Sequence, residues 1–160
     1  MGSTRRVFFA VQGDGRAMTV EVERSYQIEA PIEEVWELLA DSAVRASALG
    51  VVDHFDQQGE VTVWYLKLPL PLLRQTVSVR TWDVDRDPPR YVRFVGESKI
   101  MDVVGEHALS MDGDITTITN RFRVDGKLPG VEGFFERNID REIERLRRHV
   151  IDQLSKTGSV

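Results

Sequence analysis

One long amphipathic segment near the C-terminus constrains the fold more than any other feature of the sequence. Its apolar residues recur every three or four positions, at 131, 135, 139, 143, 146, 150 and 154. This spacing places them on one stripe of a helix that is expected to begin at Leu128 or Val131 and to end near Leu154. The other faces carry opposite charges at helical spacing, which is typical of a solvated surface. Because the stripe must be buried, the rest of the chain has to supply an apolar face of similar length.

The chain before this helix supplies that face as a series of strands. Residues 19–28 alternate, with Val20, Val22, Tyr26 and Ile28 on one side and polar residues on the other, which predicts a half-buried strand. Six more strands, separated by short turns, are predicted at residues 51–58, 60–68, 74–85, 90–98, 103–111 and 115–124. Short connections favour antiparallel pairing, so the sequence predicts one curved, seven-stranded antiparallel sheet.

Two short helices are predicted between the first and second of these strands. Pro31 stands at a favoured helix-start position, and acidic residues follow in the first turn, where the helix dipole favours anions. Asp41 or Ser42 can cap a second helix that ends at about Leu49. The predicted class is therefore α+β, with the sheet wrapped around the long last helix.

Composition and charge exclude several classes of function. The 160-residue chain has no cysteine, so disulfides, thiolate metal sites and cysteine nucleophiles are excluded. Its net charge of −5 argues against nucleic-acid binding, which needs a basic face. No apolar run approaches the length of a membrane span, and the run within residues 5–11 is too short for a signal peptide. A cytoplasmic domain is expected over residues 18–157, with residues 1–17 as a loose extension or an added strand.

Two segments carry a family resemblance. Residues 28–41, IEAPIEEVWELLAD, resemble the A-P-x-E-x-V-W signature of the START/polyketide-cyclase superfamily, also called SRPBCC. Residues 105–119, GEHALSMDGDITTIT, resemble its penultimate hairpin. The resemblance covers about residues 19–156 and implies the helix-grip fold, with a pocket between the concave sheet face and the last helix. It names no ligand, because carriers, cyclases, ring-hydroxylase subunits and co-chaperones share this fold.

Two polar residues are predicted on the apolar faces of the last two strands. By alternation Asn120 shares a side with Ile118 and Phe122, and His107 shares a side with Leu109. They either orient a polar group of a ligand or are hydrogen-bonded core residues, and a register shifted by one residue would leave them in solvent. His107 could also act as a general acid or base, because its unperturbed pKa is near neutral.

The pocket implied by the resemblance should have an apolar wall with few polar groups. Trp82 is another large aromatic residue near a predicted inward position, and such residues also serve as ordinary core. Gly130 and Gly133, at the start of the last helix, could let that end move as a gate. The candidate ligand-binding residues are Trp64, Leu66, Phe94, His107, Leu109, Asn120, Phe122, Phe134, Phe135 and Asn138.

No metal or cofactor site is expected. The three histidines, His54, His107 and His149, are far apart in sequence, and on a regular strand Asp53 should face away from His54. No nucleophile elbow, phosphate-binding loop or dinucleotide-binding glycine pattern is present.

The connection LKLPLPLLRQ, residues 66–75, combines five leucines with two prolines. Its prolines prevent pairing as a strand. If it is exposed, Leu70, Leu72 and Leu73 form an apolar tip suited to a transient membrane or protein contact. If it folds inward, it caps the pocket or the core.

Three functions remain open at this point. The first is binding or carrying of a hydrophobic or amphipathic small molecule, such as a lipid, isoprenoid, quinone or polyketide-like compound. The second is a cyclase/dehydratase-type enzyme in which His107, Glu106, Asn120 and Arg93 are the candidate residues, and which predicts a strongly perturbed titration of His107 in a closed cavity. The third is a protein-interaction module with a small cavity and an exposed leucine tip.

Overall fold

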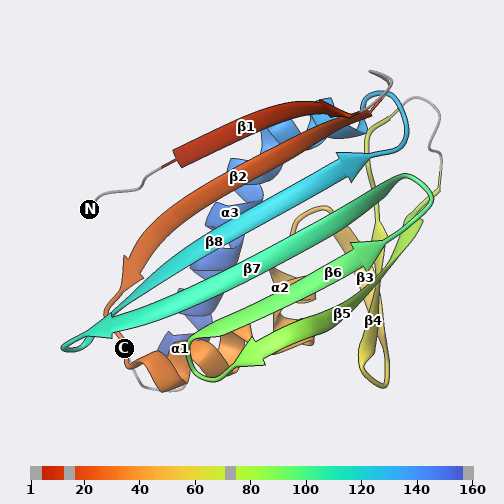
Figure 1. The fold of residues 1–160 in the computed structure, drawn as a ribbon. Helices are drawn as coiled ribbons and strands as arrows, with labels where there is room; N and C mark the ends of the chain where they lie inside the picture. The colour runs from red at the N-terminus through yellow and green to blue at the C-terminus, as the bar shows by residue number, and fades with distance from the viewer. Residues whose placement is uncertain (1–4, 13–16, 71–74, 157–160) are drawn as a thin grey trace.

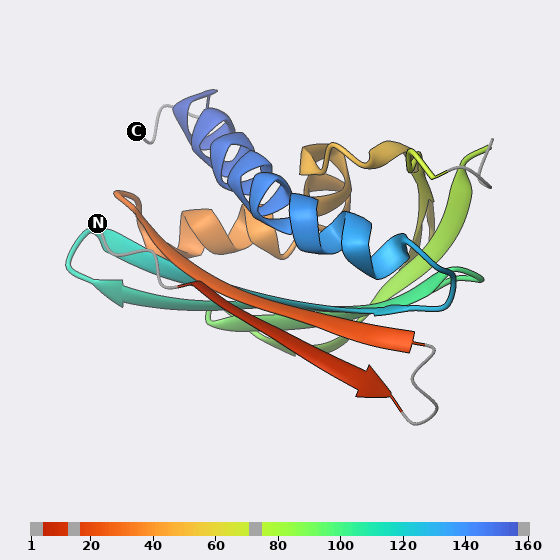
Figure 2. The same ribbon diagram turned by 90° about the horizontal axis from the view of Figure 1, so that it is seen from above.

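The structure is a computed structural model that describes residues 5–12, 17–70 and 75–156, with side chains described from Thr19 onward. Within these residues the chain forms one antiparallel sheet of eight strands in the order β1-β2-β8-β7-β6-β5-β4-β3 (Figure 1). The described helices all lie on one face of that sheet (Figure 2). The predicted helix-grip fold, with a curved sheet around a long C-terminal helix, is confirmed.

The boundaries of the elements follow the sequence closely. The strands are β1 (Arg5–Gln12), β2 (Ala17–Ile28), β3 (Val52–Gln58), β4 (Val61–Leu66), β5 (Val77–Asp87), β6 (Tyr91–Glu97), β7 (Met101–Asp112) and β8 (Ile115–Gly126). The helices are α1 (Ile32–Leu39), α2 (Ser42–Ala48) and α3 (Val131–Lys156). All seven predicted strands are confirmed, with ends that move by at most three residues. An eighth strand, β1, pairs antiparallel with β2 within the N-terminal extension.

The two short helices form where the local signals place them. Pro31 has a φ of −61° and precedes the first turn of α1, which carries Glu33 and Glu34. The side chain of Asp41 accepts hydrogen bonds from the backbone N–H groups of Ala43 and Val44 at 2.9 and 3.4 Å, so Asp41 is the cap of α2. The side chains that α1 buries are Ile32, Val35, Trp36 and Leu39.

The predicted apolar stripe of α3 is buried along its whole length. Its members are Val131, Phe135, Ile139, Ile143, Leu146, Val150 and Leu154. The residues up to Ile143 pack with the middle of the sheet, and those from Leu146 onward pack with α1. The helix therefore joins two core clusters, and the first of them contains the candidate site.

A glycine in β7 allows the sheet face under α3 to be aromatic. Gly105 stands opposite Phe94 of β6 and Phe122 of β8 in the strand register. A Cβ atom on Gly105 would lie 2.2 Å from Cε1 of Phe94, so the phenyl ring lies across β7 at this position. The ring is buried, and it connects the cavity to the polar groups described below.

We predict that Gly105→Ala lowers the free energy of unfolding by about 1–3 kcal/mol, because the added methyl group displaces the buried Phe94 ring. Urea denaturation measures this loss. The control is Gly133→Ala in α3, where the closest neighbour of the new Cβ is the flexible end of Arg137 at 3.3 Å. There the stability should stay equal or rise by up to about 1 kcal/mol. Phe94→Leu in the Gly105→Ala background should recover part of the loss, and no recovery would contradict this explanation.

Candidate ligand-binding cavity

An apolar cavity lies between the concave sheet face and the N-terminal half of α3. Its volume is about 40 Å³. Its walls come from β4, β6, β7, β8, α3 and the turn between α2 and β3, and every lining residue except Glu142 is apolar. The arrangement suits an apolar ligand, because Glu142 and the indole N–H of Trp64 are the only polar side-chain groups that these lining residues carry.

Half of the candidate ligand-binding residues line this cavity, namely Trp64, Leu66, Phe94, Phe122 and Phe135. The other candidates lie nearby but outside it. Leu109 belongs to the second core cluster, beside α1. Phe134 packs edge-on against Phe135, with ring centroids 5.2 Å apart. Asn138 donates from Nδ2 to the carbonyl oxygen of Phe134 at 2.8 Å, so that donor is used within its own helix.

Seven further lining residues were absent from the candidate set. Val103, Val124 and Ile139 occupy positions that strand or helix periodicity already places inward, so the pattern could have identified them. Met101 extends β7 beyond its predicted start. Leu49, Val51 and Glu142 come together only through the tertiary packing of α3 on the turn between α2 and β3. The full set is Leu49, Val51, Met101, Val103, Val124, Ile139 and Glu142.

Glu142 is the one carboxylate in the cavity wall. It is 6% exposed, and Oε2 accepts a hydrogen bond from the backbone N–H of Gly50 at 2.6 Å. Burial raises the pKa of Glu142, and the hydrogen bond from Gly50 and the charge of Arg145 oppose that rise. The residue thus ties α3 to the turn that follows α2. Because Glu142 lies among the exposed charged residues of a helix, the local sequence does not predict that it is buried.

Beside the cavity, three polar side chains form a hydrogen-bonded chain across β7, β8 and β2. His107 and Asn120 stand directly opposite each other in the register, and both are fully buried on the apolar face where alternation placed them. Nδ1 of His107 donates to Oδ1 of Asn120 at 2.6 Å, and Nδ2 of Asn120 donates to the hydroxyl of Tyr26 at 3.1 Å. Burial raises the pKa of Tyr26 to about 12. This series of hydrogen bonds leaves Nε2 of His107 with no hydrogen-bond partner among the described residues.

His107 is held neutral by its surroundings. Its pKa is lowered to about 4, mainly by burial and also by the nearby charge of Arg45, while the hydrogen bond to Asn120 acts in the opposite direction. The ring lies against Phe94 and Phe122, with centroid distances of 6.0 and 5.8 Å. A neutral imidazole therefore stands immediately behind two aromatic rings of the cavity wall.

We predict that His107 makes stability fall on acidification. The pKa of His107 is lower in the folded than in the unfolded chain, so the unfolded chain binds this proton first. The contribution is fully present above about pH 6.5 and is lost as the pH falls toward 4, by up to about 3 kcal/mol. Urea denaturation should show that the free energy of unfolding falls more steeply over this pH range for the native protein than for His107→Gln.

Other titrating groups are shared by the two proteins and cancel in this comparison. His149→Gln, at a half-buried position on α3, is the matched control and should follow the native protein. If the free energy of unfolding changed with pH in the same way for the native protein and for His107→Gln, His107 would not be the cause of the loss in acid.

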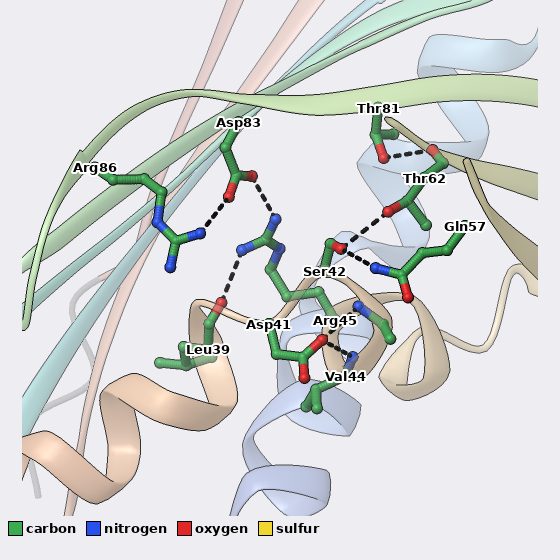
Figure 3. Close-up of polar contacts among 11 residues, drawn as sticks. Leu39, Asp41, Ser42, Val44, Arg45, Gln57, Thr62, Thr81, Asp83 and Arg86 are labelled. Atoms are coloured by element: carbon green, nitrogen blue, oxygen red, sulfur yellow. Dashed lines mark hydrogen bonds and ion pairs between the residues drawn. The ribbon is translucent and has the colours of Figure 1, made fainter. Parts of the chain in front are cut away.

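Arg45 is a buried cation that sequence analysis missed. It is 3% exposed on α2, and its guanidinium donates to the carbonyl oxygen of Leu39 at 2.9 Å and to Oδ1 of Asp83 at 2.6 Å (Figure 3). Asp83 also pairs with Arg86 at 3.5 Å. The guanidinium carbon of Arg45 lies 4.9 Å from the centre of the Phe94 ring, a cation–π contact. No local pattern marks this arginine, because its burial depends on β5.

The start of α2 is fixed to the sheet by hydroxyl groups. Thr62 of β4 and the amide of Gln57 both donate to Oγ of Ser42, at 2.9 and 3.1 Å (Figure 3). Thr81 of β5 in turn donates to the carbonyl oxygen of Thr62 at 2.7 Å. Together with Arg45, these contacts hold α2 firmly against one side of the cavity.

Two of the residues considered for an enzyme lie on the opposite face of the sheet. Glu106 and Arg93 face the outer side, where Glu106 contacts Arg121 at 3.5 Å and Arg93 at 3.9 Å. The alternation along β7 that buries His107 turns Glu106 outward, so these two residues cannot reach the cavity. Trp82 is also on the outer side, paired with Val95 and only half-buried, so its predicted inward position is wrong.

The expected separation of Asp53 and His54 is wrong. The register of β3 shifts between Val52 and His54, and this irregularity lets Nδ1 of His54 approach Oδ2 of Asp53 at 2.8 Å. His54 also stacks on Tyr65 of β4, at 4.3 Å between ring centroids. Across residues 5–12, 17–70 and 75–156, no group of three or more histidine, aspartate or glutamate residues is arranged to hold a metal ion.

The proline-rich connection is described only in part. Leu70 is half-buried, packs against the first core cluster and lies beside Gly130 at the start of α3. Leu72 and Leu73 lie outside the described residues. None of the helices in the described part of the chain is long and apolar enough to cross a membrane.

Comparison with known proteins identifies the family. A sequence model of the family described as polyketide cyclase/dehydrase and lipid transport matches residues 19–150. The chain belongs to this family. No protein with curated annotation matches the sequence.

Several solved structures share the fold of this family member, although their sequences are only distantly similar to it. A conserved protein from Geobacillus kaustophilus has a TM-score of 0.69 at 16% identity, covering 86% of this chain and 96% of that one. The Zhui aromatase/cyclase from Streptomyces sp. R1128 has a TM-score of 0.67 at 17% identity, with coverages of 89% and 99%. A START superfamily protein from Mycobacterium smegmatis has a TM-score of 0.68 at 10% identity, with coverages of 86% and 98%.

Proposed function

We propose that this protein binds a hydrophobic or amphipathic small molecule between the concave sheet face and α3. The observation that carries this proposal is the cavity wall, which is apolar except for Glu142 and is built from both the sheet and the helix. Burial of apolar ligand surface would drive binding, at roughly 25 cal/mol per Å². The lipid-transport part of the family description supports the same function.

The size of the cavity adds a requirement to this proposal. Ligand pockets usually enclose about 300–1,000 Å³, whereas the space here is about 40 Å³. The walls must therefore move apart when a ligand enters. We place the opening at the start of α3, because Gly130 there has a φ of +93° and Leu70, which lies beside it, packs with the apolar core cluster. By contrast, α2 is held by Arg45 and Ser42.

A cyclase/dehydratase-type enzyme is the second candidate function. The observation in its favour is His107, whose pKa is strongly lowered in a buried position behind the cavity wall. However, a pKa of about 4 makes this imidazole a weak base at neutral pH, and Glu106 and Arg93 lie on the other face of the sheet. Binding is therefore the better-supported function.

We predict that the purified protein carries or takes up one hydrophobic molecule per chain. Native mass spectrometry followed by organic extraction identifies a copurified compound, and a thermal-shift panel of hydrophobic compounds tests the ligand-free protein. Ile139→Trp should weaken binding at least tenfold, because Ile139 lines the cavity and the larger side chain fills it.

The matched control is Arg141→Trp, on the exposed side of the same helix, which should bind within twofold of the native protein. A ligand-free mass with no thermal shift across the panel would rule out the proposed function. Equal weakening by the two tryptophan variants would place the ligand elsewhere.

A further inference from the structure

Three buried side chains around Phe94 each carry a polar atom that has no hydrogen-bond partner among the described residues. These atoms are Nε of Arg45, Nε1 of Trp64 and Nε2 of His107. The side chains are 3%, 5% and 0% exposed, respectively. They come from α2, β4 and β7, so the grouping is a product of the tertiary fold.

All three side chains contact the same ring. The guanidinium carbon of Arg45 lies 4.9 Å from the centre of the Phe94 ring, and the ring centres of Trp64 and His107 lie 5.7 and 6.0 Å from it. Phe94 and Trp64 both line the cavity. Arg45 and His107 do not line it and stand behind that wall. The unpaired polar atoms are therefore grouped around one wall residue at the edge of the cavity, and a ligand group contacts all three only when this part of the wall shifts as the ligand enters.

Burying these three polar atoms without hydrogen bonds costs free energy unless another molecule forms the missing hydrogen bonds. A buried donor or acceptor without a partner costs about 1–3 kcal/mol, and native proteins contain few of them. Three around a single cavity-lining residue therefore point to a ligand whose polar end makes these hydrogen bonds.

The chemistry of the three atoms defines that polar end. The N–H groups of Arg45 and Trp64 are donors and call for an oxygen acceptor. Nδ1 of His107 donates to Asn120, so Nε2 is an acceptor and calls for a hydroxyl.

Charge also selects between kinds of oxygen. The guanidinium of Arg45 is already paired with Asp83 at 2.6 Å. A ligand carboxylate at this position would bring a second negative charge close to Asp83. Arg86, which also pairs with Asp83 at 3.5 Å, is half exposed and so offsets that repulsion only in part. A neutral oxygen avoids that repulsion and still accepts from Arg45 or Trp64.

We propose that the polar end of the ligand is a neutral hydroxyl group seated beside Phe94, which accepts a hydrogen bond from Arg45 or Trp64 and donates one to Nε2 of His107, rather than a carboxylate. This inference rests on the proposed function, because it assigns the ligand class for the same cavity. It distinguishes alcohols and phenols from ketones, fatty acids and plain hydrocarbons.

The test uses three probes that share one ring system: naphthalene, 2-naphthol and 2-naphthoate. Isothermal titration at pH 7, where 2-naphthol is neutral and 2-naphthoate is ionised, should give at least tenfold tighter binding for 2-naphthol than for either of the others. Trp64→Phe keeps an aromatic ring and removes only the indole N–H group, so it should reduce the advantage of 2-naphthol over naphthalene several-fold. Trp82→Phe, on the outer side of the sheet, is the matched control and should leave the advantage unchanged.

The outcomes separate the inference from the proposed function. Equal affinities for naphthalene and 2-naphthol, both abolished by Ile139→Trp, would overturn the inference and leave the proposed function standing. Tightest binding of 2-naphthoate would overturn it in favour of carboxylate ligands. Binding of none of the three probes would also overturn it, and the copurified compound would then test the proposed function separately. The comparison of probes on the native protein stands even if a variant fails to fold.

Discussion

Packing of the α3 stripe on the concave sheet face is the contact on which the rest of this structure depends. Each large apolar side chain that is fully buried contributes about 1.5–3 kcal/mol, and α3 buries seven of them in one line from Val131 to Leu154. The sheet can accept the helix because its inner face is apolar and aromatic, with Gly105 making room for Phe94. The cavity lies within this interface, where the sheet and the N-terminal half of α3 do not fill the space between them.

The two sides of the cavity are held by different forces. On the α2 side the contacts are polar: Arg45 binds Asp83, and Glu142 of α3 accepts from Gly50. On the opposite side, the apolar side chain of Leu70 lies beside Gly130. Charge-assisted hydrogen bonds in buried sites depend strongly on geometry, whereas apolar contacts tolerate sliding. This difference is the basis for the proposed opening at the start of α3 and the proposed polar end near α2.

The two faces of the sheet have separate roles. On the outer face, charged residues such as Glu23, Glu106 and Arg121 pair across neighbouring strands in solvent, and such exposed pairs contribute little to stability. On the inner face, the few polar residues are buried and their electrostatics are strong, as the lowered pKa of His107 illustrates. Membership of the polyketide cyclase/dehydrase and lipid transport family is consistent with chemistry or binding confined to this inner face.

The sequence by itself determined the order of the elements, the apolar stripe of α3 and the inward position of His107 and Asn120. These follow from periods of about 3.6 and 2 residues, which are local properties of helices and strands. Only the tertiary structure decided which distant side chains meet. Arg45 is buried because β5 brings Asp83 to it, Glu142 joins the cavity wall because α3 crosses the turn at Gly50, and Asp53 reaches His54 because β3 is irregular. The volume of the cavity likewise depends on how side chains from five elements and a turn fill one space, and no local pattern encodes that sum.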